Sequence, residues 1–194
     1  MEKFYHINSR KGISKAWQPG DTIALNGYNN YINNIIDCCL YVRNDPQPEM
    51  AINHVLRLES DDEKVLNAKN ISIQQRDRNL GHLRREFVFE RVRRNNYPLL
   101  PSRMTSTYLV ESIEEAKAWS SILNIESNDF SILEVEVLPE TKIFHTYAGH
   151  IDNLENALKD LEIEANAHAY WRGTKLGHAE ILASGPLLVI NHIS

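Results

Sequence analysis

The chain has 194 residues, of which 42% are hydrophobic and 24% charged, and its formal net charge is −5. This length favours one domain whose core needs no disulfide or metal, and the ordinary composition favours a soluble globular protein. No apolar run approaches the roughly 18 residues that a membrane-spanning helix needs, and the N-terminus shows no secretory signal. We therefore expect a single cytoplasmic domain over residues 1–194.

The first predicted elements are two short strands and a helix. The segments FYHIN and DTIALN, which begin at Phe4 and Asp21, have the residue types of short strands. Apolar residues at helical spacing then predict a helix over residues 31–42, with asparagines available as caps.

A longer helical region follows. Ser60 and Glu63 form a capping-box pattern, which predicts the start of a helix. The arginine-rich stretch 80–94 is also expected to be helical, and Pro98 and Pro101 stop it.

Strand patterns dominate the second half of the chain. They are STYLV (106–110), FSILEVEV (130–137), EILA (180–183) and LLVINHI (187–193). Between them we expect one helix that opens with the capping box of Ser112 and Glu115, and another over residues 153–162. Helices thus gather in the N-terminal half and strands in the C-terminal half, which favours an α+β fold. Residues 28–98 are expected to form a helical, arginine-rich insertion.

The sequence lacks common catalytic and metal-binding motifs. Nothing in it matches a P-loop, a G-x-G-x-x-G turn or H-E-x-x-H. His145 and His150 are five residues apart, and the adjacent Cys38 and Cys39 have no further ligands at workable spacing. We therefore expect no metal site, and two buried reduced thiols favour a reducing compartment.

Three polar residues fall on three separate predicted strands. His6 lies on the first strand, Tyr108 on the strand that leads into the capped helix, and Glu180 opens a late strand. A histidine, a tyrosine and a glutamate in this order resemble the H-Y-E signature of the ADP-ribosyltransferase superfamily. The segments TYLVES…A…W and EILASGPLLVI are similar to the strand-then-helix segment and the Glu-led strand of that family.

The resemblance extends to a second pair of motifs. R-R-x-F-V-F-E-x-V-R-R over residues 84–94 and L-P-S-R over residues 100–103 are similar to motifs in a small group of bacterial proteins. Those proteins look like compact relatives of poly-ADP-ribose polymerases and rifamycin-modifying transferases. The resemblance implies a split antiparallel β-sheet core and NAD as a co-substrate.

The chemistry of NAD cleavage agrees with these residue types. Breaking the nicotinamide–ribose bond passes through an oxocarbenium-like centre, and a carboxylate that accepts a hydrogen bond from the ribose 2′-OH lowers that barrier. Glu180 is the candidate for this role. Tyr108 and Trp119 are candidates to stack on nicotinamide, and His6 is a candidate to bind the hydroxyls of the adenosine-side ribose.

Arginines supply the remaining candidates. Arg103, next to Ser102, can pair with the NAD pyrophosphate or cap the preceding helix. Residues 76–103 carry eight arginines against three acidic residues, which leaves a net charge of −10 for the rest of the chain. This basic patch is either a solvated helix face with internal ion pairs or a surface for an anionic partner. The candidates to bind a nucleic-acid substrate are Arg84, Arg85, Arg91 and Arg94.

The resemblance implies a NAD-dependent mono-ADP-ribosyltransferase. A small intracellular bacterial member of this superfamily can serve as a toxin or a phage-defence effector that modifies RNA, DNA or protein, with an antitoxin or immunity protein as a partner. Two alternatives remain open at this point. They are transfer to a small molecule, as in rifamycin modification, and a non-catalytic interaction module on the same fold.

Overall fold

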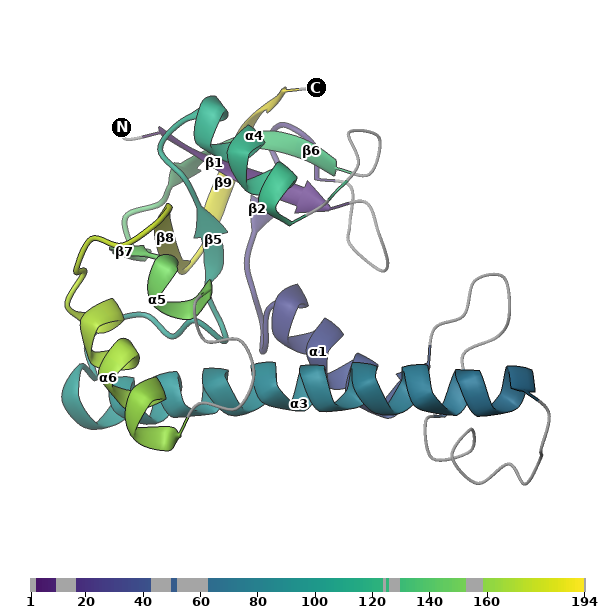
Figure 1. Ribbon diagram of the computed structural model, residues 1–194. Helices are drawn as coiled ribbons and strands as arrows, with labels where there is room; N and C mark the ends of the chain where they lie inside the picture. The colour runs from purple at the N-terminus through teal and green to yellow at the C-terminus, as the bar shows by residue number, and fades with distance from the viewer. Residues whose placement is uncertain are drawn as a thin grey trace.

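The computed structural model describes residues 3–9, 17–42, 50–51, 63–123, 125, 130–152 and 159–193 (Figure 1). Its strands are β1 (Lys3–Ser9), β2 (Thr22–Ile23), β3 (Tyr41–Val42), β4 (Met50–Ala51), β5 (Thr107–Leu109), β6 (Phe130–Val137), β7 (Lys142–Tyr147), β8 (Ala179–Ser184) and β9 (Leu187–Ile193). Its helices are α1 (Asn30–Leu40), α3 (Glu63–Asn96), α4 (Ile113–Ile122), α5 (Gly149–Asp152) and α6 (Asp160–Trp171). The α+β class is therefore confirmed.

Two antiparallel sheets form the centre of the molecule. One has the strand order β1-β6-β9-β2 and the other has the order β5-β8-β7. An isolated bridge between Tyr5 and Val110, with both backbone hydrogen bonds at 2.9 Å, joins β1 to the end of β5. The strands that carry His6, Tyr108 and Glu180 are consequently neighbours, in the order β1, β5, β8.

Side chains from both sheets pack into a core between them. Phe4, Leu109 and Ile181 are each 1% exposed and belong to one apolar cluster with residues of β6 and β9. Because side chains alternate along a strand, Tyr108 and Leu182 point to the opposite face of the three-stranded sheet. There they contact a second cluster, which α3 and α6 supply.

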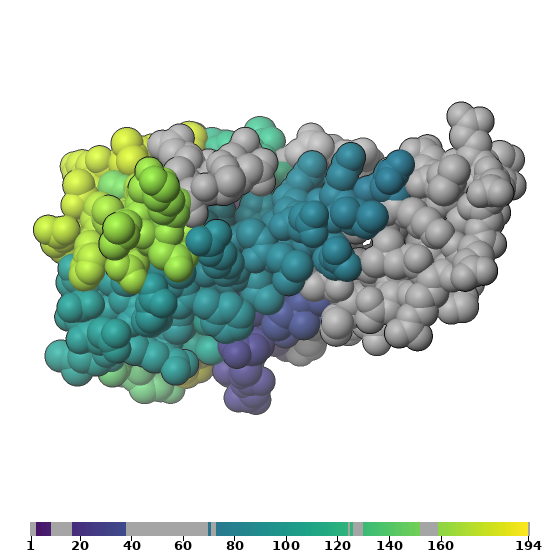
Figure 2. All heavy atoms as spheres, turned by 60° about the horizontal axis from the view of Figure 1, so that its bottom comes forward, coloured from purple at the N-terminus to yellow at the C-terminus, as the bar shows by residue number. Residues whose placement is uncertain are grey.

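Helix α3 covers that opposite face. It is 34 residues long and runs beneath the three-stranded sheet, with α6 beside one end (Figures 1 and 2). Phe89 of α3 packs edge-to-face against Tyr170 of α6, and Trp171 Nε1 donates a 2.9 Å hydrogen bond to the Phe89 carbonyl. No helix in the described part of the chain combines the length and hydropathy needed to cross a bilayer.

Two helix starts follow from local capping chemistry. Ser112 Oγ accepts a 3.1 Å hydrogen bond from the Glu115 amide, which confirms Ser112 as the N-cap of α4. The Glu115 carboxylate accepts a 3.0 Å hydrogen bond from the Glu111 amide instead of the Ser112 amide, so only half of the expected capping box forms. Asn29 Oδ1 accepts a 3.1 Å hydrogen bond from the Ile32 amide at the start of α1. Both caps satisfy amide groups that a helix leaves without an intrahelical partner.

Several expectations need correction or fall outside the described residues. The concentration of helices in the N-terminal half is not supported, because α4, α5 and α6 lie in the other half. Strand β7 was not expected, and α6 begins only at Asp160. Outside the described residues lie Ser60, residues 153–158 and the side chains of Cys38 and Cys39.

The close approach of Gly149 to residue 176 gives a test of the packing. A Cβ at Gly149 would lie 2.5 Å from the carbonyl oxygen of Leu176. We expect Gly149→Ala to lower the free energy of unfolding by about 1–3 kcal/mol, because this backbone has to move. Urea denaturation measures the change.

Gly81 in α3 is the matched control, because a Cβ there meets nothing within 4 Å. Gly81→Ala should raise the free energy of unfolding by about 0.5–1 kcal/mol through helix propensity. Equal effects of the two substitutions would contradict the packing described at Gly149.

Candidate functional site

Charged and tyrosine side chains gather between the three-stranded sheet and α3. We call them the buried polar cluster. Its members are Arg85 and Glu86 of α3, Arg103 before β5, Glu180 of β8, Tyr108 of β5 and Tyr170 of α6. Tyr31 of α1, which is 37% exposed, joins the cluster at its edge. The two arginines and two glutamates cancel in charge, and each of these four residues is at most 9% exposed.

Arg103 is at the centre of the buried polar cluster. Its Nε donates a 3.0 Å hydrogen bond to Glu86 Oε2, and its Nη1 donates to Glu180 Oε1 and, over 2.7 Å, to the Tyr170 hydroxyl. The guanidinium carbon lies 4.9 Å from the ring centroid of Tyr170 and 5.3 Å from that of Tyr108. Cation–π attraction and two ion pairs thus act on the same group.

Glu180 is held through one of its two carboxylate oxygens. Within the described part of the chain, Arg103 and the Tyr170 hydroxyl both donate to Oε1. Burial raises the pKa of the Glu180 carboxyl, whereas Arg103 and the hydrogen bond from Tyr170 act to lower it. Oε2 is therefore the oxygen to which an incoming hydroxyl group can donate a hydrogen bond.

Local structure explains why these side chains meet. Along β8, Glu180 and Leu182 alternate with residues that point into the core between the two sheets. Glu180 and Leu182 therefore face the helices and not the other sheet. Arg103 lies in a turn whose conformation is fixed through its own carbonyl. That carbonyl accepts hydrogen bonds from Asn29 Nδ2 at 2.7 Å and from the Tyr108 hydroxyl at 3.0 Å.

Tyr108 is part of the wall of the buried polar cluster. One face of its ring lies against Arg103, and Tyr31 meets it edge-on with 6.5 Å between the ring centroids. Burial raises the pKa of Tyr108, so the phenol remains a hydrogen-bond donor at neutral pH. Burial likewise raises the pKa of Tyr31, to about 12.

His6 contacts Tyr108 through the main chain. Its Nδ1 lies 2.9 Å from the Tyr108 carbonyl oxygen, and because a carbonyl can only accept, Nδ1 carries the hydrogen. Burial lowers the pKa of His6, which favours the neutral ring with Nε2 as an acceptor. Alternation along β1 places the imidazole on the side of Phe4, whereas the Tyr108 and Glu180 side chains face α3 and α6.

Trp119 lies beside the start of β8. Its Nε1 donates a 3.0 Å hydrogen bond to the carbonyl of Ala179, the residue before Glu180. Its ring centroid is 5.8 Å from that of His178, and it packs against an apolar cluster that includes residues of β1. Trp119 therefore fixes the backbone next to Glu180.

Ser102 interacts with α3 in this structure. Its hydroxyl donates a 2.8 Å hydrogen bond to Glu90 Oε2, and Arg93 and Arg94 donate to the same carboxylate. Burial acts to raise the pKa of Glu90, but these hydrogen bonds outweigh it and the pKa lies below its usual value. The contacts connect the end of α3 to the loop that carries Arg103.

The other arginines proposed to bind nucleic acid also have partners. Arg84 Nη2 lies 2.7 Å from Asp160 Oδ1, and Arg91 donates to Glu164, so both connect α3 to α6. Arg85 is buried and donates to the Tyr31 hydroxyl at 2.8 Å. The basic composition of α3 is thus partly neutralised within the molecule.

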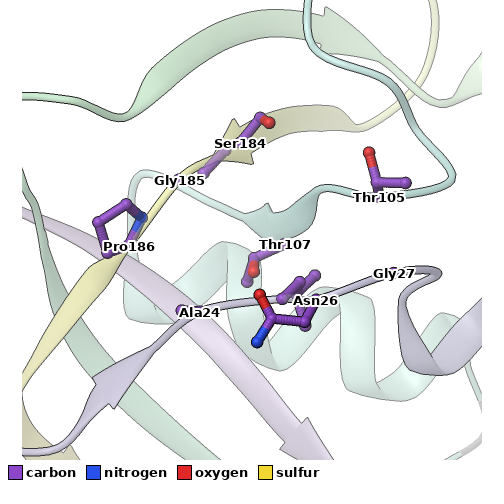
Figure 3. A pocket seen from close by; sticks show the side chains of 10 residues that line it. Ala24, Asn26, Gly27, Thr105, Thr107, Ser184, Gly185 and Pro186 are labelled. Atoms are coloured by element: carbon purple, nitrogen blue, oxygen red, sulfur yellow. The ribbon is translucent and has the colours of Figure 1, made fainter.

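A cavity of about 310 Å³ lies beside β5 (Figure 3). Alternation along β5 places it on the other side of the strand from the Tyr108 side chain. Thr107, which alternates with Tyr108 along β5, is part of its wall, and its lining carries no charge. The lining residues are Ala24, Leu25, Asn26, Gly27, Thr105, Thr107, Ala183, Ser184, Gly185 and Pro186. None of them belongs to the buried polar cluster, so the two features are separate.

Sequence reasoning missed three members of the buried polar cluster, which are Tyr31, Glu86 and Tyr170. Glu86 lies within the arginine-rich motif, where its alternation with arginines indicates a solvated helix face. Tyr170 lies beyond the end of the helix that the periodicity predicts. No group of three or more metal-ligating side chains occurs within the described ranges.

The fold and the site define an α+β protein whose curled antiparallel sheet carries a buried arginine–carboxylate–tyrosine cluster on one face. The chain belongs to the family described as protein of unknown function DUF2441, whose model matches residues 4–194. No curated protein matches the chain.

The lowered pKa of His6 predicts a pH dependence of stability. The unfolded chain binds a proton at His6 more readily than the folded protein, so folding stability falls as the pH drops through 6.5, the ordinary pKa of histidine. In His6→Asn the side-chain amide keeps a donor near the Tyr108 carbonyl but does not titrate. Melting temperatures from pH 8 to 5 should therefore fall less in His6→Asn than in the wild type. If the melting temperatures of the two proteins fall equally with pH, the His6 imidazole is not buried in its neutral form.

Proposed function

We propose that the protein is a NAD-dependent mono-ADP-ribosyltransferase with Glu180 as its catalytic carboxylate. The observation that carries this proposal is the adjacency of β1, β5 and β8, the strands that bear His6, Tyr108 and Glu180. A carboxylate with one oxygen fixed by Arg103 and Tyr170 supports the same assignment.

The proposed reaction uses the second oxygen of Glu180. The bond between C1′ of the ribose and nicotinamide breaks, and nicotinamide leaves with the electron pair. Glu180 Oε2 accepts the 2′-OH hydrogen bond while positive charge develops at C1′, and a carboxylate in this low-dielectric site stabilises that charge more than water would. The acceptor nucleophile then bonds to C1′, and its proton passes to solvent water.

In this proposal Tyr108 contributes to NAD binding from the face of the sheet toward α3 and α6, and His6 contributes from the opposite face. The fixed Nδ1–H of His6 leaves Nε2 to accept a hydrogen bond from a ribose hydroxyl, as the sequence motif implies. One face of the Tyr108 ring is taken by Arg103, so nicotinamide would stack on the other face, with Trp119 a further candidate beside it.

The exposed arginines of α3 are the feature that bears on the acceptor. Arg94 and Arg91 lie on the exposed side of α3, where phosphate contacts would compete with their acidic partners. We therefore propose RNA, DNA or protein as the acceptor class, in a cytoplasmic toxin or phage-defence effector with a neutralising partner protein. A rifamycin-like small molecule is the remaining acceptor.

A non-catalytic interaction module is the second candidate function. It is favoured by the closure of the site, because the side chain of Glu180 is 9% exposed and that of Arg103 is 6% exposed. A substrate would have to reach Oε2 through that small opening.

Replacement of the carboxylate separates the two candidates. Glu180→Gln should reduce nicotinamide release from NAD by roughly 10²–10³-fold, since it removes the charge that stabilises the transition state. Equilibrium dialysis should show nearly unchanged NAD binding. Glu140→Gln, at an exposed turn, is the control and should keep full activity. If the wild type neither binds nor cleaves NAD, the interaction module is the better account.

Labelled NAD identifies the acceptor. After incubation with cell extract, the label should remain with RNA, DNA or protein and be released by the matching nuclease or protease. Expression of the wild type should arrest growth, and Glu180→Gln should relieve the arrest. Label on an antibiotic, with unmodified macromolecules and normal growth, would replace the toxin proposal with small-molecule modification.

A further inference from the structure

We propose that Arg103 is a positioning residue, which holds the carboxylate of Glu180 in place, and that Glu86 of α3 in turn fixes the guanidinium of Arg103. This inference rests on the proposed function and assigns Arg103 to the carboxylate instead of the NAD pyrophosphate. The guanidinium fork spans two carboxylates, with Nε on Glu86 Oε2 at 3.0 Å and Nη1 on Glu180 Oε1. A planar guanidinium with both ends engaged fixes the direction of each carboxylate.

The surroundings of Arg103 restrict its movement. Its guanidinium lies near the rings of Tyr108 and Tyr170, within 5.3 Å and 4.9 Å of their centroids. Its backbone carbonyl is bound by Asn29 at 2.7 Å and by the Tyr108 hydroxyl at 3.0 Å. Neither the side chain nor the turn that carries it can shift without breaking several buried hydrogen bonds.

The position of Arg103 determines which oxygen of Glu180 is presented to a substrate. Arg103 and Tyr170 both donate to Oε1, from the loop before β5 and from α6. This leaves Oε2 directed at the substrate hydroxyl in a single carboxylate orientation. Catalytic groups need such fixed placement, because a displacement of about 1 Å can cost roughly 10²-fold in rate.

The groups around Glu180 also have opposite effects on its ionisation. Burial raises its pKa, Arg103 and Tyr170 lower it, and Glu86 raises it through charge repulsion. Tyr108 faces the same group of side chains from β5 and is itself kept protonated by burial. Removing the positive charge of Arg103 should therefore raise the pKa of Glu180, and removing the negative charge of Glu86 should lower it.

Three variants test the proposal by the pH profile of nicotinamide release. Arg103→Lys keeps the charge but loses the fork, so kcat should fall roughly 10²-fold while KM for NAD changes little. Glu86→Gln should move the acid limb of kcat to lower pH, and Arg103→Met should move it to higher pH. An unchanged kcat in Arg103→Lys would overturn the proposal. So would acid limbs of kcat that shift in the same direction in Glu86→Gln and Arg103→Met.

A second measurement separates this inference from the proposed function. The ¹³C NMR titration of Glu180 Cδ, assigned by its absence in Glu180→Gln, reports the same pKa changes without any substrate. If the wild type does not cleave NAD, the proposed function fails, and opposite shifts in the titration still establish the action of Arg103 and Glu86 on Glu180. If the titration of Glu180 is the same in the variants as in the wild type, the proposal for Arg103 and Glu86 is overturned.

Folding is monitored by thermal melting. If Arg103→Met does not fold, the nearly isosteric Glu86→Gln and the charge-conserving Arg103→Lys decide the outcome, and the double variant Arg103→Met/Glu86→Gln restores the charge balance. If Arg103 had a purely structural role, its substitution would lower the melting temperature. The acid limb of kcat, measured on the protein that remains folded, would then stay where it is in the wild type.

Discussion

The paired contacts of Arg103 with Glu86 and Glu180 are the interaction on which the rest of the structure depends. Transfer of an ion from water into a protein interior costs several kcal/mol, and only a partner at close range offsets that cost. Here the charges alternate from Arg85 through Glu86 and Arg103 to Glu180, so each buried charge has a neighbour of opposite sign. Removing one member would leave an uncompensated charge, at about 3–5 kcal/mol.

The same arrangement is compatible with both stability and the proposed chemistry. A carboxylate exposed to water would be flexible and well solvated, and it would stabilise a developing positive charge only weakly. Glu180 is instead desolvated, held at one oxygen by Arg103 and Tyr170, and placed on the strand next to Tyr108. The closure of the cluster, which favours a non-catalytic module, is also the property that gives a buried carboxylate its electrostatic effect.

The sequence predicted the features that local signals determine. Alternation over residues 130–137 matches β6, and the N-cap at Ser112 marks the start of α4. The site was predictable only in part, because its partners are far apart in the chain. His6 and Tyr108 are separated by 102 residues, and Arg84 and Asp160 by 76. No periodicity links such pairs, so an ion-paired helix face and an anion-binding one look alike in sequence.

The alternating charges have a consequence for how the chain folds. The partners of Arg103 come from α3, α6 and β8, so the loop that carries it meets all of them only when the distant parts of the chain have come together. The arginine-rich region 28–98 contributes Arg85 and Glu86 to the same interior. It therefore cannot be excised as an independent module, because its side chains share one interior with the three-stranded sheet and α6.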